Sequence, residues 1–573
     1  MFKNQLLLVW RNLLRNKLYS FITIAGLAVG IAAGFLILQY VYYETSYDAF
    51  FENKENIYRV QLNRYNDGEL TTQWAAGCAG AGYHLKEEFP EVLDYVTLTS
   101  SGAQISYEDK YFKTTHAYYA GGNFFEVFSI PLIRGVDSLV LKDPYTVVLS
   151  KSLAEKIFDQ NDPVGKNIKM NDATDFLVTG VFADLPERSH MKFDLLYSFE
   201  SYVRFTSEEV RTAWQWDGFL NYVVLRPGTA PEALESRFPE FIERKVGQEL
   251  AEYNAGMEFN LQPLTKIHLI SDYRGEIKTT GDEKATYFLL IIGLFVLFIA
   301  WINYVNLTTA HSLKRAREVG IRKVLGGVRS QLIRQFLFES SITNGLAFLI
   351  AFLFVVVSFP FFNHFVGRES SYTWPDASWF WLGMITFFIG GVLLSGFYPS
   401  LVLSNFRPVT VLKGKFTSSP KGNLLRKGLV TFQFLASIFL ITGTYVVYRQ
   451  LQFLQNQDLG VNINQTLAVY TPNFSSDSVF NLKDDIFSNQ LQQETTVSGL
   501  TASSAIPGRT PGWNAGGIRL INQTDRESNQ YRIIGCDDDF MELYGLESIE
   551  GRLFNADFGG EEGNVIFNEA AVR

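Results

Sequence analysis

The side chains best placed to bind a partner lie in one basic stretch between two long apolar runs. This stretch, residues 311–336, reads HSLKRAREVGIRKVLGGVRSQLIRQF and holds seven Lys and Arg but a single acid, Glu318. Apolar residues recur through it at roughly helical spacing, so cationic side chains stay available on the other face. A flank that only orients membrane spans is the simpler alternative, but it needs few charges and no long amphipathic pattern. The pattern therefore favours a helix that docks a partner.

No other group of residues has the spacing of a catalytic or cofactor site. The sequence contains no G-x-x-x-x-G-K-[ST] loop, no H-E-x-x-H, no C-x-x-C and no G-x-S-x-G. Its six histidines are scattered without the spacing of metal ligands. We therefore predict a non-catalytic protein with no catalytic, cofactor-binding or metal-binding residues and no nucleic-acid partner.

Five apolar runs of about 20 residues lack Asp, Glu, Lys and Arg, which is the length needed to cross a bilayer core of roughly 30 Å. They cover residues 21–43, 287–310, 341–362, 379–403 and 429–448. Aromatic residues such as Tyr42, Trp379 and Tyr448 lie near their ends, where rings favour the headgroup level. The spans carry no charge, which argues against an ion relay within the membrane.

The uneven distribution of charge indicates which ends of the spans face the cytoplasm. Segments 1–20, 311–340 and 404–428 carry 17 of the 50 Lys and Arg but only two of the 59 Asp and Glu. Because loops rich in Lys and Arg stay inside, we predict a cytoplasmic N terminus and large domains outside the inner (plasma) membrane. The fold class is an α-helical polytopic membrane protein with α+β extracytoplasmic domains.

The spans and the charge pattern divide the chain into segments. The predicted order is a cytoplasmic amphipathic helix at 1–20, spans at 21–43, 285–310, 341–362, 379–403 and 429–448, outer domains at 44–284 and 449–573, a short outer loop at 363–378, and cytoplasmic segments at 311–340 and 404–428. In the first outer domain, residues 146–149, 176–181 and 222–225 have strand patterns, whereas residues 152–158 and 239–250 have helical patterns. This mixture predicts an α+β domain.

The first two segments each carry a further pattern. Residues 1–20 interleave Leu, Val and Trp with Lys and Arg, which predicts a basic amphipathic helix in the inner interface, in contact with membrane lipid. A plain positive flank is the alternative. In the first span, Gly26, Gly30 and Gly34 form a row of small residues at spacing four, which predicts close packing against another helix.

The second outer segment repeats the first. NFFEVFSIPLIRG at 123–135 matches DFMELYGLESIEG at 539–551, and a strand-then-helix pattern follows each block, from Thr146 and from Asn564. In both halves a basic flank, a span and a polar region come first. We interpret this as an internal duplication, and we expect residues 564–567 to form a strand and the natural chain to continue beyond Arg573 with further spans.

The two cysteines give little information. Cys78 and Cys536 lie in different outer segments. Two free or buried thiols are the simplest interpretation, and a disulfide between the outer domains is the alternative.

Three segments at or near the cytoplasmic face resemble FtsX-like permeases of ATP-binding-cassette (ABC) systems. They are EVGIRKVLGG at 318–327, NFRPVTVLKGK at 405–415 and the segment 424–460. The outer segment 44–284 is similar to MacB-type periplasmic core domains, notably GVFADLPERSHMKFD at 180–194. The likeness covers nearly the whole chain and is strongest to the duplicated eight-span permeases of Bacteroidetes-type bacteria, of which this sequence looks C-terminally truncated.

The resemblance implies specific roles. In this family the stretch after the second span is the coupling helix that sits on an ATPase. The matching residues are Glu318, Gly320, Ile321, Arg322, Lys323 and Gly326. MacB itself carries an N-terminal ATPase, whereas this sequence shows none, so ATP is expected to bind to a separate cytosolic ABC ATPase. A periplasmic adaptor, an outer-membrane channel, and a dimer or pseudo-dimer of permease halves are further expected partners.

Two functions fit these features. The first is an ABC transporter permease that couples ATP hydrolysis to movements of its periplasmic domains, in efflux or export of a drug, a peptide or a lipid-like substrate. The alternative is a mechanotransmitting regulator or sensor of the cell envelope, which would activate a hydrolase or report an antimicrobial peptide.

Overall fold

The structure, a computed structural model, describes two compact units of the chain. It describes residues 2–572 except 103, 109, 115, 272, 315–320, 322–323, 325–327, 368–377, 405–419, 470–485, 510–512, 525–528 and 556–562. The first unit holds residues 1–47, 268–270 and 281–454, and the second holds residues 48–267, 271–280 and 455–573.

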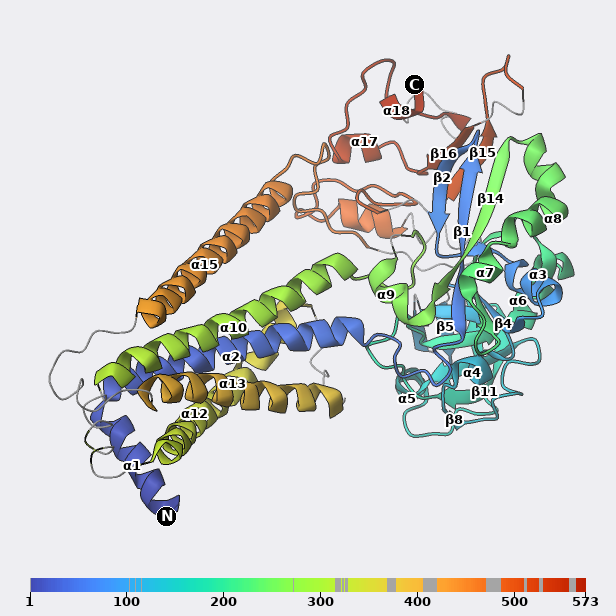
Figure 1. Cartoon of the computed structure of the whole chain (residues 1–573). Helices are drawn as coiled ribbons and strands as arrows, with labels where there is room; N and C mark the ends of the chain where they lie inside the picture. The colour runs from blue at the N-terminus through green and yellow to red at the C-terminus, as the bar shows by residue number, and fades with distance from the viewer. Residues whose placement is uncertain are drawn as a thin grey trace. The chain divides into compact units, whose positions relative to one another are not determined.

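Long helices make up the first unit (Figure 1). They are α1 (Phe2–Arg15), α2 (Lys17–Thr45), α10 (Glu283–Lys314), α12 (Arg329–Phe365), α13 (Ser378–Ser404) and α15 (Pro420–Gln455). Helices α2, α10, α12 and α13 pack together around apolar side chains such as Ile31, Ala300 and Ala351. Large apolar residues, including Phe352 and Phe361, also cover outward-facing surfaces of these helices. Helices that are apolar on all sides are typical of a lipid environment.

Four described helical segments are long and apolar enough to cross a membrane. They are Lys17–Thr45, Glu283–Ala310, Ser330–Phe365 and Lys427–Gln455, and they include the first, second, third and fifth expected spans. A shorter apolar segment, Trp381–Leu393, lies in α13, where the fourth span is expected. The helical, polytopic part of the fold class is confirmed, whereas the number and the limits of the spans stay predictions.

The second unit contains a mixed sheet with helices around it (Figure 1). Its elements are β1 (Ile57–Asn66), β2 (Glu69–Trp74), β3 (Gly77–Cys78), α3 (Ala81–Glu88), β4 (Val92–Ser100), β5 (Gln104–Tyr107), β6 (Lys110–Lys113), β7 (Ala117–Ala120), α4 (Phe124–Phe128), β8 (Leu132–Arg134), β9 (Thr146–Ser150), α5 (Lys151–Phe158), β10 (Asn167–Met170), β11 (Thr174–Phe182), β12 (Leu195–Ser198), α6 (Phe199–Phe205), the 3-10 helix η1 (Glu208–Thr212), β13 (Asp217–Leu225), α7 (Pro231–Glu235), α8 (Phe238–Glu252), β14 (Ala255–Pro263), the 3-10 helix η2 (Leu264–Lys266), α9 (Ile267–Ile270, which continues into the first unit), β15 (Trp513–Ile518), β16 (Asn529–Ile533), α17 (Phe540–Leu543) and α18 (Glu569–Val572).

The strand order places β1 and β13 side by side near one end of this sheet. The order is β14-β1-β13-β4-β7-β12-β9-β11-β10-β5-β6, with β2 paired to β1, β3 to β13 and β8 to β11. The β7–β12 and β9–β11 pairs are parallel, and the other pairs are antiparallel. The α+β part of the fold class is confirmed.

The local patterns explain why these elements form. The strand β9 is buried at all five positions because β11 and β12 flank it, and such strands have continuous apolar sequences. The helix α5 follows directly, with the Ser150 hydroxyl accepting a hydrogen bond from the Leu153 amide. The helix α8 has Pro239 in its first turn, where a missing N–H has no cost.

The internal repeat has the same local structure in both copies. Two matching aromatic rings are buried in each copy: Phe124 and Phe128 in α4, and Phe540 in α17 with Tyr544 directly after it. The residue that follows the last of these rings has a left-handed backbone conformation in each copy, with φ of 51° at Ser129 and 66° at Gly545. Matching backbone bonds close the two helix ends, from Ile130 to Phe125 and from Leu546 to Met541. The sequence match therefore reflects a shared helix and turn.

The strand expected at residues 564–567 is not formed. These residues have no strand pairing, and the helix α18 begins at Glu569. In the first copy, β9 is held between β11 and β12, both of which follow it in the chain. In the described part of the chain, no such strands lie beside residues 564–567, which therefore lack the neighbours that a strand needs.

Both cysteines are free thiols in the structure, in agreement with the simpler interpretation of the sequence. Burial raises the pKa of both thiols, that of Cys78 to about 12, but Cys536 is partly exposed whereas Cys78 is buried. Because the thiolate is the reactive form, we expect a maleimide to label Cys536 and to leave Cys78 unmodified in the folded protein. Mass spectrometry after labelling with and without urea checks this; equal labelling of both thiols in the folded protein would contradict it.

Candidate transmission site

The predicted coupling segment 311–340 overlaps the end of α10 at Lys314 and the start of α12 at Arg329, and the six residues predicted to couple lie between these helices. Ile321 is described there as helical and 47% exposed, and Val324 is helical and 63% exposed. The other residues predicted to couple lie outside the described residues: Glu318, Gly320, Arg322, Lys323 and Gly326. Their role in docking stays a prediction.

The glycines of the first span face α10 at close range. A Cβ atom added at Gly30 would lie 2.5 Å from Cβ of Ala300, and one at Gly34 would lie 2.5 Å from Cδ2 of Leu297. A Cβ atom at Gly26 would lie 3.6 Å from Nδ2 of Asn303, which is an ordinary contact. Close approach of α2 and α10 therefore depends on Gly30 and Gly34.

We expect Gly30→Ala to weaken the packing of α2 on α10 by about 1–3 kcal/mol, because the added methyl group needs space that Ala300 already fills. Gly26→Ala makes the same chemical change in an open position and is the matched control. Thermal unfolding of the full chain in detergent measures both. Equal midpoints for the two variants would show that the row is not a packing surface.

A buried polar cluster fixes the C-terminal end of α2 within the first unit. Nε2 of His268 lies 2.7 Å from Oε2 of Glu44, which lies in the last turn of α2. The Tyr47 ring stacks on the imidazole with 3.4 Å between ring centroids, and the Gly281 amide donates to the His268 carbonyl at 2.7 Å. Gly281 comes just before α10. The cluster thus ties the segment that leads into α10 to the end of α2.

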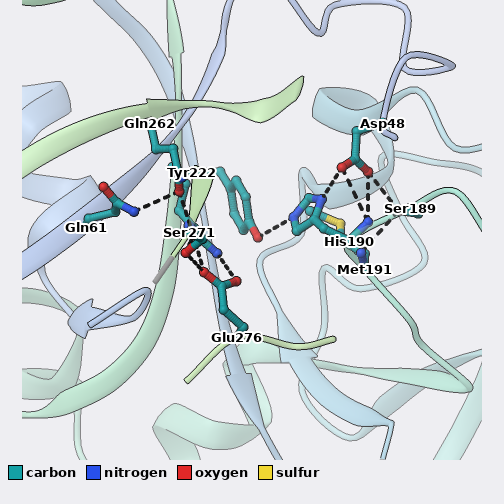
Figure 2. A network of polar contacts seen from close by, with 10 residues as sticks. Asp48, Gln61, Ser189, His190, Met191, Tyr222, Gln262, Ser271 and Glu276 are labelled. Atoms are coloured by element: carbon teal, nitrogen blue, oxygen red, sulfur yellow. Dashed lines mark hydrogen bonds and ion pairs between the residues drawn. The ribbon is translucent and has the colours of Figure 1, made fainter. Parts of the chain in front are cut away.

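Asp48, three residues after α2 ends, is anchored inside the second unit. Its side chain is fully buried and its backbone is left-handed, with φ of 57°. The carboxylate accepts hydrogen bonds from the Ser189 hydroxyl and from the His190 amide, both at 3.0 Å. Nδ1 of His190 lies 2.9 Å from Oδ2. Figure 2 shows Asp48 held between these two residues, with Tyr222 on the far side of the imidazole.

The segment that leads into α10 is anchored in the same unit by a second ion pair. Both terminal nitrogens of Arg59, on β1, donate to the carboxylate of Glu276 at 2.6 Å. Arg59 is fully buried and also donates to Gln262 on β14 at 2.6 Å. Ser271 donates to Glu276 as well (Figure 2). Bidentate pairing of this kind fixes the orientation as well as the distance of two groups.

One loop of the second unit binds both the segment that follows α2 and the segment that precedes α10. Asp48 binds the amide and hydroxyl groups of residues 189 and 190, and Lys278 donates to the carbonyl oxygens of Glu187 at 3.1 Å and Ser189 at 2.9 Å. We name residues 187–191 the exit loop. It joins the segment that follows α2 to the segment that precedes α10.

The geometry of this site supports structural rather than catalytic chemistry. The His190 imidazole lies between a carboxylate and a phenol, as in an acid–base relay. Its Nδ1 faces Asp48, and its Nε2 lies 2.8 Å from the phenol oxygen of Tyr222. Tyr222 is fully buried, however, and burial raises its pKa, so the phenol keeps its proton. Within the described ranges, no group of three or more His, Cys, Asp or Glu could hold a metal ion.

Sequence analysis did not identify Asp48, Arg59, Glu276 or Lys278 as a site. The available signal was the segment GVFADLPERSHMKFD, which carries the resemblance to periplasmic core domains and contains the whole exit loop. A second signal was the position of Asp48 and Lys278, which are ionisable and lie a few residues from the two ends of the predicted outer domain 44–284.

Two family models match the chain. The MacB-like periplasmic core domain matches residues 20–241, and the FtsX-like permease C-terminal domain matches residues 290–408. The first match contains the exit loop, Asp48 and Arg59. The second contains the predicted coupling segment, most of α10 and all of α12.

Curated relatives and solved structures were also compared. The macrolide export ATP-binding/permease protein MacB of Neisseria meningitidis is 23% identical over 326 residues, which span 56% of this chain and 47% of the relative. The pyoverdine export ATP-binding/permease protein PvdT of Pseudomonas syringae pv. syringae is 22% identical over 361 residues, 60% of this chain and 50% of the relative. The chain thus spans about half the length of these relatives.

Among solved structures, a domain described as part of a permease protein from Porphyromonas gingivalis is 26% identical. The match covers 37% of this chain and 91% of that domain, with a TM-score of 0.34.

The two family models, one on the outer domain and one on the membrane helices, match the resemblance found in the sequence. The chain belongs to the FtsX-like permeases that carry a MacB-like periplasmic core domain.

Proposed function

We propose that this chain is the permease subunit of an ABC transporter and that it transmits the action of a separate cytosolic ATPase to its periplasmic domain. The N terminus lies in the cytoplasm, and the protein spans the inner membrane. The segment 311–340 docks on the ATPase through Glu318, Arg322 and Lys323. The chain itself performs no catalysis, and its partner binds the ATP.

The exit loop is the observation that carries this proposal. It anchors Asp48 after α2 and Lys278 before α10, the two helices whose close packing depends on Gly30 and Gly34. A displacement of the helix pair would therefore pull on one loop of the outer domain from two points. Uncharged spans favour such rigid-body transmission over an ion relay.

We further propose that the transported compound is an amphipathic drug, peptide or lipid-like molecule. This rests on the relatives named for export of macrolides and of pyoverdine, which this chain matches over about half of their length. A periplasmic adaptor and an outer-membrane channel would complete the export route. Two permease halves, in a dimer or in a duplicated chain, would share the ATPase.

Export can be tested by measuring how much of each compound cells retain from a panel of amphipathic drugs and peptides. Cells with the wild-type chain and its ATPase are compared with cells that carry Arg322→Glu/Lys323→Glu. We expect wild-type cells to retain less of at least one compound. If the ATPase binds normally and retention never differs, the chain is an envelope regulator rather than an exporter.

A further inference from the structure

The N-terminal helix α1 has one face that contacts the bundle. Val9 is buried on that face. One turn further on, Nδ2 of Asn12 donates a hydrogen bond to Oε1 of Glu339 on α12 at 2.6 Å. Glu339 lies in the third turn of α12, which begins at Arg329, and it falls within the predicted coupling segment 311–340. The position of α1 is thereby linked to the first turns of α12.

A second face of α1 exposes a continuous apolar stripe. Its members recur three or four residues apart and continue past the bend at Asn16 into α2: Leu7, Trp10, Leu14, Leu18 and Phe21. Their exposed fractions run from 46% at Leu7 to 74% at Leu18. The bundle covers none of these side chains fully. An apolar stripe that joins the lipid-facing surface of a membrane helix fits the acyl region of a bilayer.

A third face of α1 is basic. Arg11 and Arg15 are one helical turn apart and exposed, and Lys17 follows at the bend. Residues 1–43 contain no Asp or Glu. In the part of the chain that the structure describes, neither arginine forms an ion pair with a carboxylate. Guanidinium groups next to an apolar stripe are suited to phosphate groups at the surface of a membrane.

We propose that α1 anchors the protein to anionic phospholipid headgroups and that the Asn12–Glu339 bond transmits this anchoring to α12. Arg11 and Arg15 bind lipid phosphates, while Leu7, Trp10 and Leu14 insert beneath them. The proposal rests on the proposed orientation, in which α1 lies at the cytoplasmic leaflet. It adds to the proposed function a lipid that sets the position of α12 beside the coupling segment.

Lipid binding is tested with the purified full chain in a mild detergent. Phosphatidylglycerol and phosphatidylcholine are added in equal amounts, and the bound lipids are counted by native mass spectrometry. Each basic side chain near an anionic surface contributes roughly fivefold to binding, so we expect the loss of two in Arg11→Gln/Arg15→Gln to lower the preference for phosphatidylglycerol about 25-fold. Arg11→Lys/Arg15→Lys, which keeps the charge, should retain most of the preference.

A charge control separates a specific anchor from general attraction. Lys142→Gln/Lys169→Gln removes the same charge from exposed positions of the outer domain and should leave the preference within about twofold of the wild type. An equal loss in this control would overturn the anchor. An unchanged preference in Arg11→Gln/Arg15→Gln, with reduced recovery of the ATPase, would show that α1 binds protein instead of lipid.

The link to α12 has its own test, which needs neither ATPase nor transport. The full chain is placed in vesicles of phosphatidylcholine alone or mixed equally with phosphatidylglycerol, and amide hydrogen exchange is followed in residues 330–343. We expect the anionic lipid to slow exchange in the wild type. Asn12→Ala should bind the lipid normally yet lose this slowing. The same slowing in Asn12→Ala would overturn the proposed role of the bond.

Discussion

Glu276→Ala is expected to lower the free energy of unfolding of the outer domain by about 3–5 kcal/mol. Arg59 is fully buried, and both of its terminal nitrogens bind the Glu276 carboxylate. Removing the carboxylate leaves a guanidinium group buried without its counter-charge, which costs far more than the loss of an exposed pair. Urea unfolding of residues 44–284 measures the effect. We expect this segment to fold alone, because it contains its own sheet and three apolar clusters.

An exposed ion pair in the same domain gives a matched control. Arg64 and Asp217 lie 2.7 Å apart, but their side chains are 25% and 28% exposed. Asp217→Ala should therefore cost at most about 1 kcal/mol. Arg59→Met combined with Glu276→Leu should cost less than Glu276→Ala alone, because no buried charge remains. If Glu276→Ala and Asp217→Ala have equal effects, the buried pair does not anchor the segment before α10.

Arg322→Glu/Lys323→Glu should reduce recovery of the ATPase with the purified permease by more than about tenfold, since two attractive charges become repulsive at the predicted interface. The residues belong to one of the three segments that carry the resemblance to FtsX-like permeases. Membrane insertion should persist, because five of the seven basic residues in the segment remain. The ATPase that stays bound after detergent extraction is quantified against the amount of permease.

The control for this variant makes the same charge change in the same segment. Lys314→Glu/Arg334→Glu reverses two charges outside the six-residue motif, in α10 and α12. It should keep most of the ATPase. Undiminished recovery with Arg322→Glu/Lys323→Glu, or an equal loss in the control, would remove the reason to place docking at these residues.

Local sequence patterns predicted some elements of the fold. The spans follow from uninterrupted apolar runs, and β9 and α8 follow from a short apolar segment and from Pro239 at a helix start. Residues 564–567 show the limit of such patterns. They have the same pattern as β9, but a strand forms only when neighbouring strands complete its hydrogen bonds.

The anchors of the exit segments could not be predicted in the same way. Asp48 meets His190 across 142 residues, and Arg59 meets Glu276 across 217 residues. No period or motif connects positions so distant, and a buried ion pair has the same local sequence as a pair of exposed charges. The apolar and basic faces of α1 could be predicted, whereas the bond from Asn12 to Glu339 depends on the packing of α1 against α12.

The central claim is that the segment between α10 and α12 contacts an ABC ATPase. It is tested most directly by a photoreactive amino acid at Val324, which is 63% exposed, in the full chain in living cells. The same group at Val29 of α2, which is 57% exposed, is the control. We expect light to link Val324 to an ATPase identified by mass spectrometry, and to give no such product from Val29. Absence of an ATPase from the Val324 products, or equal amounts from both positions, would contradict the claim.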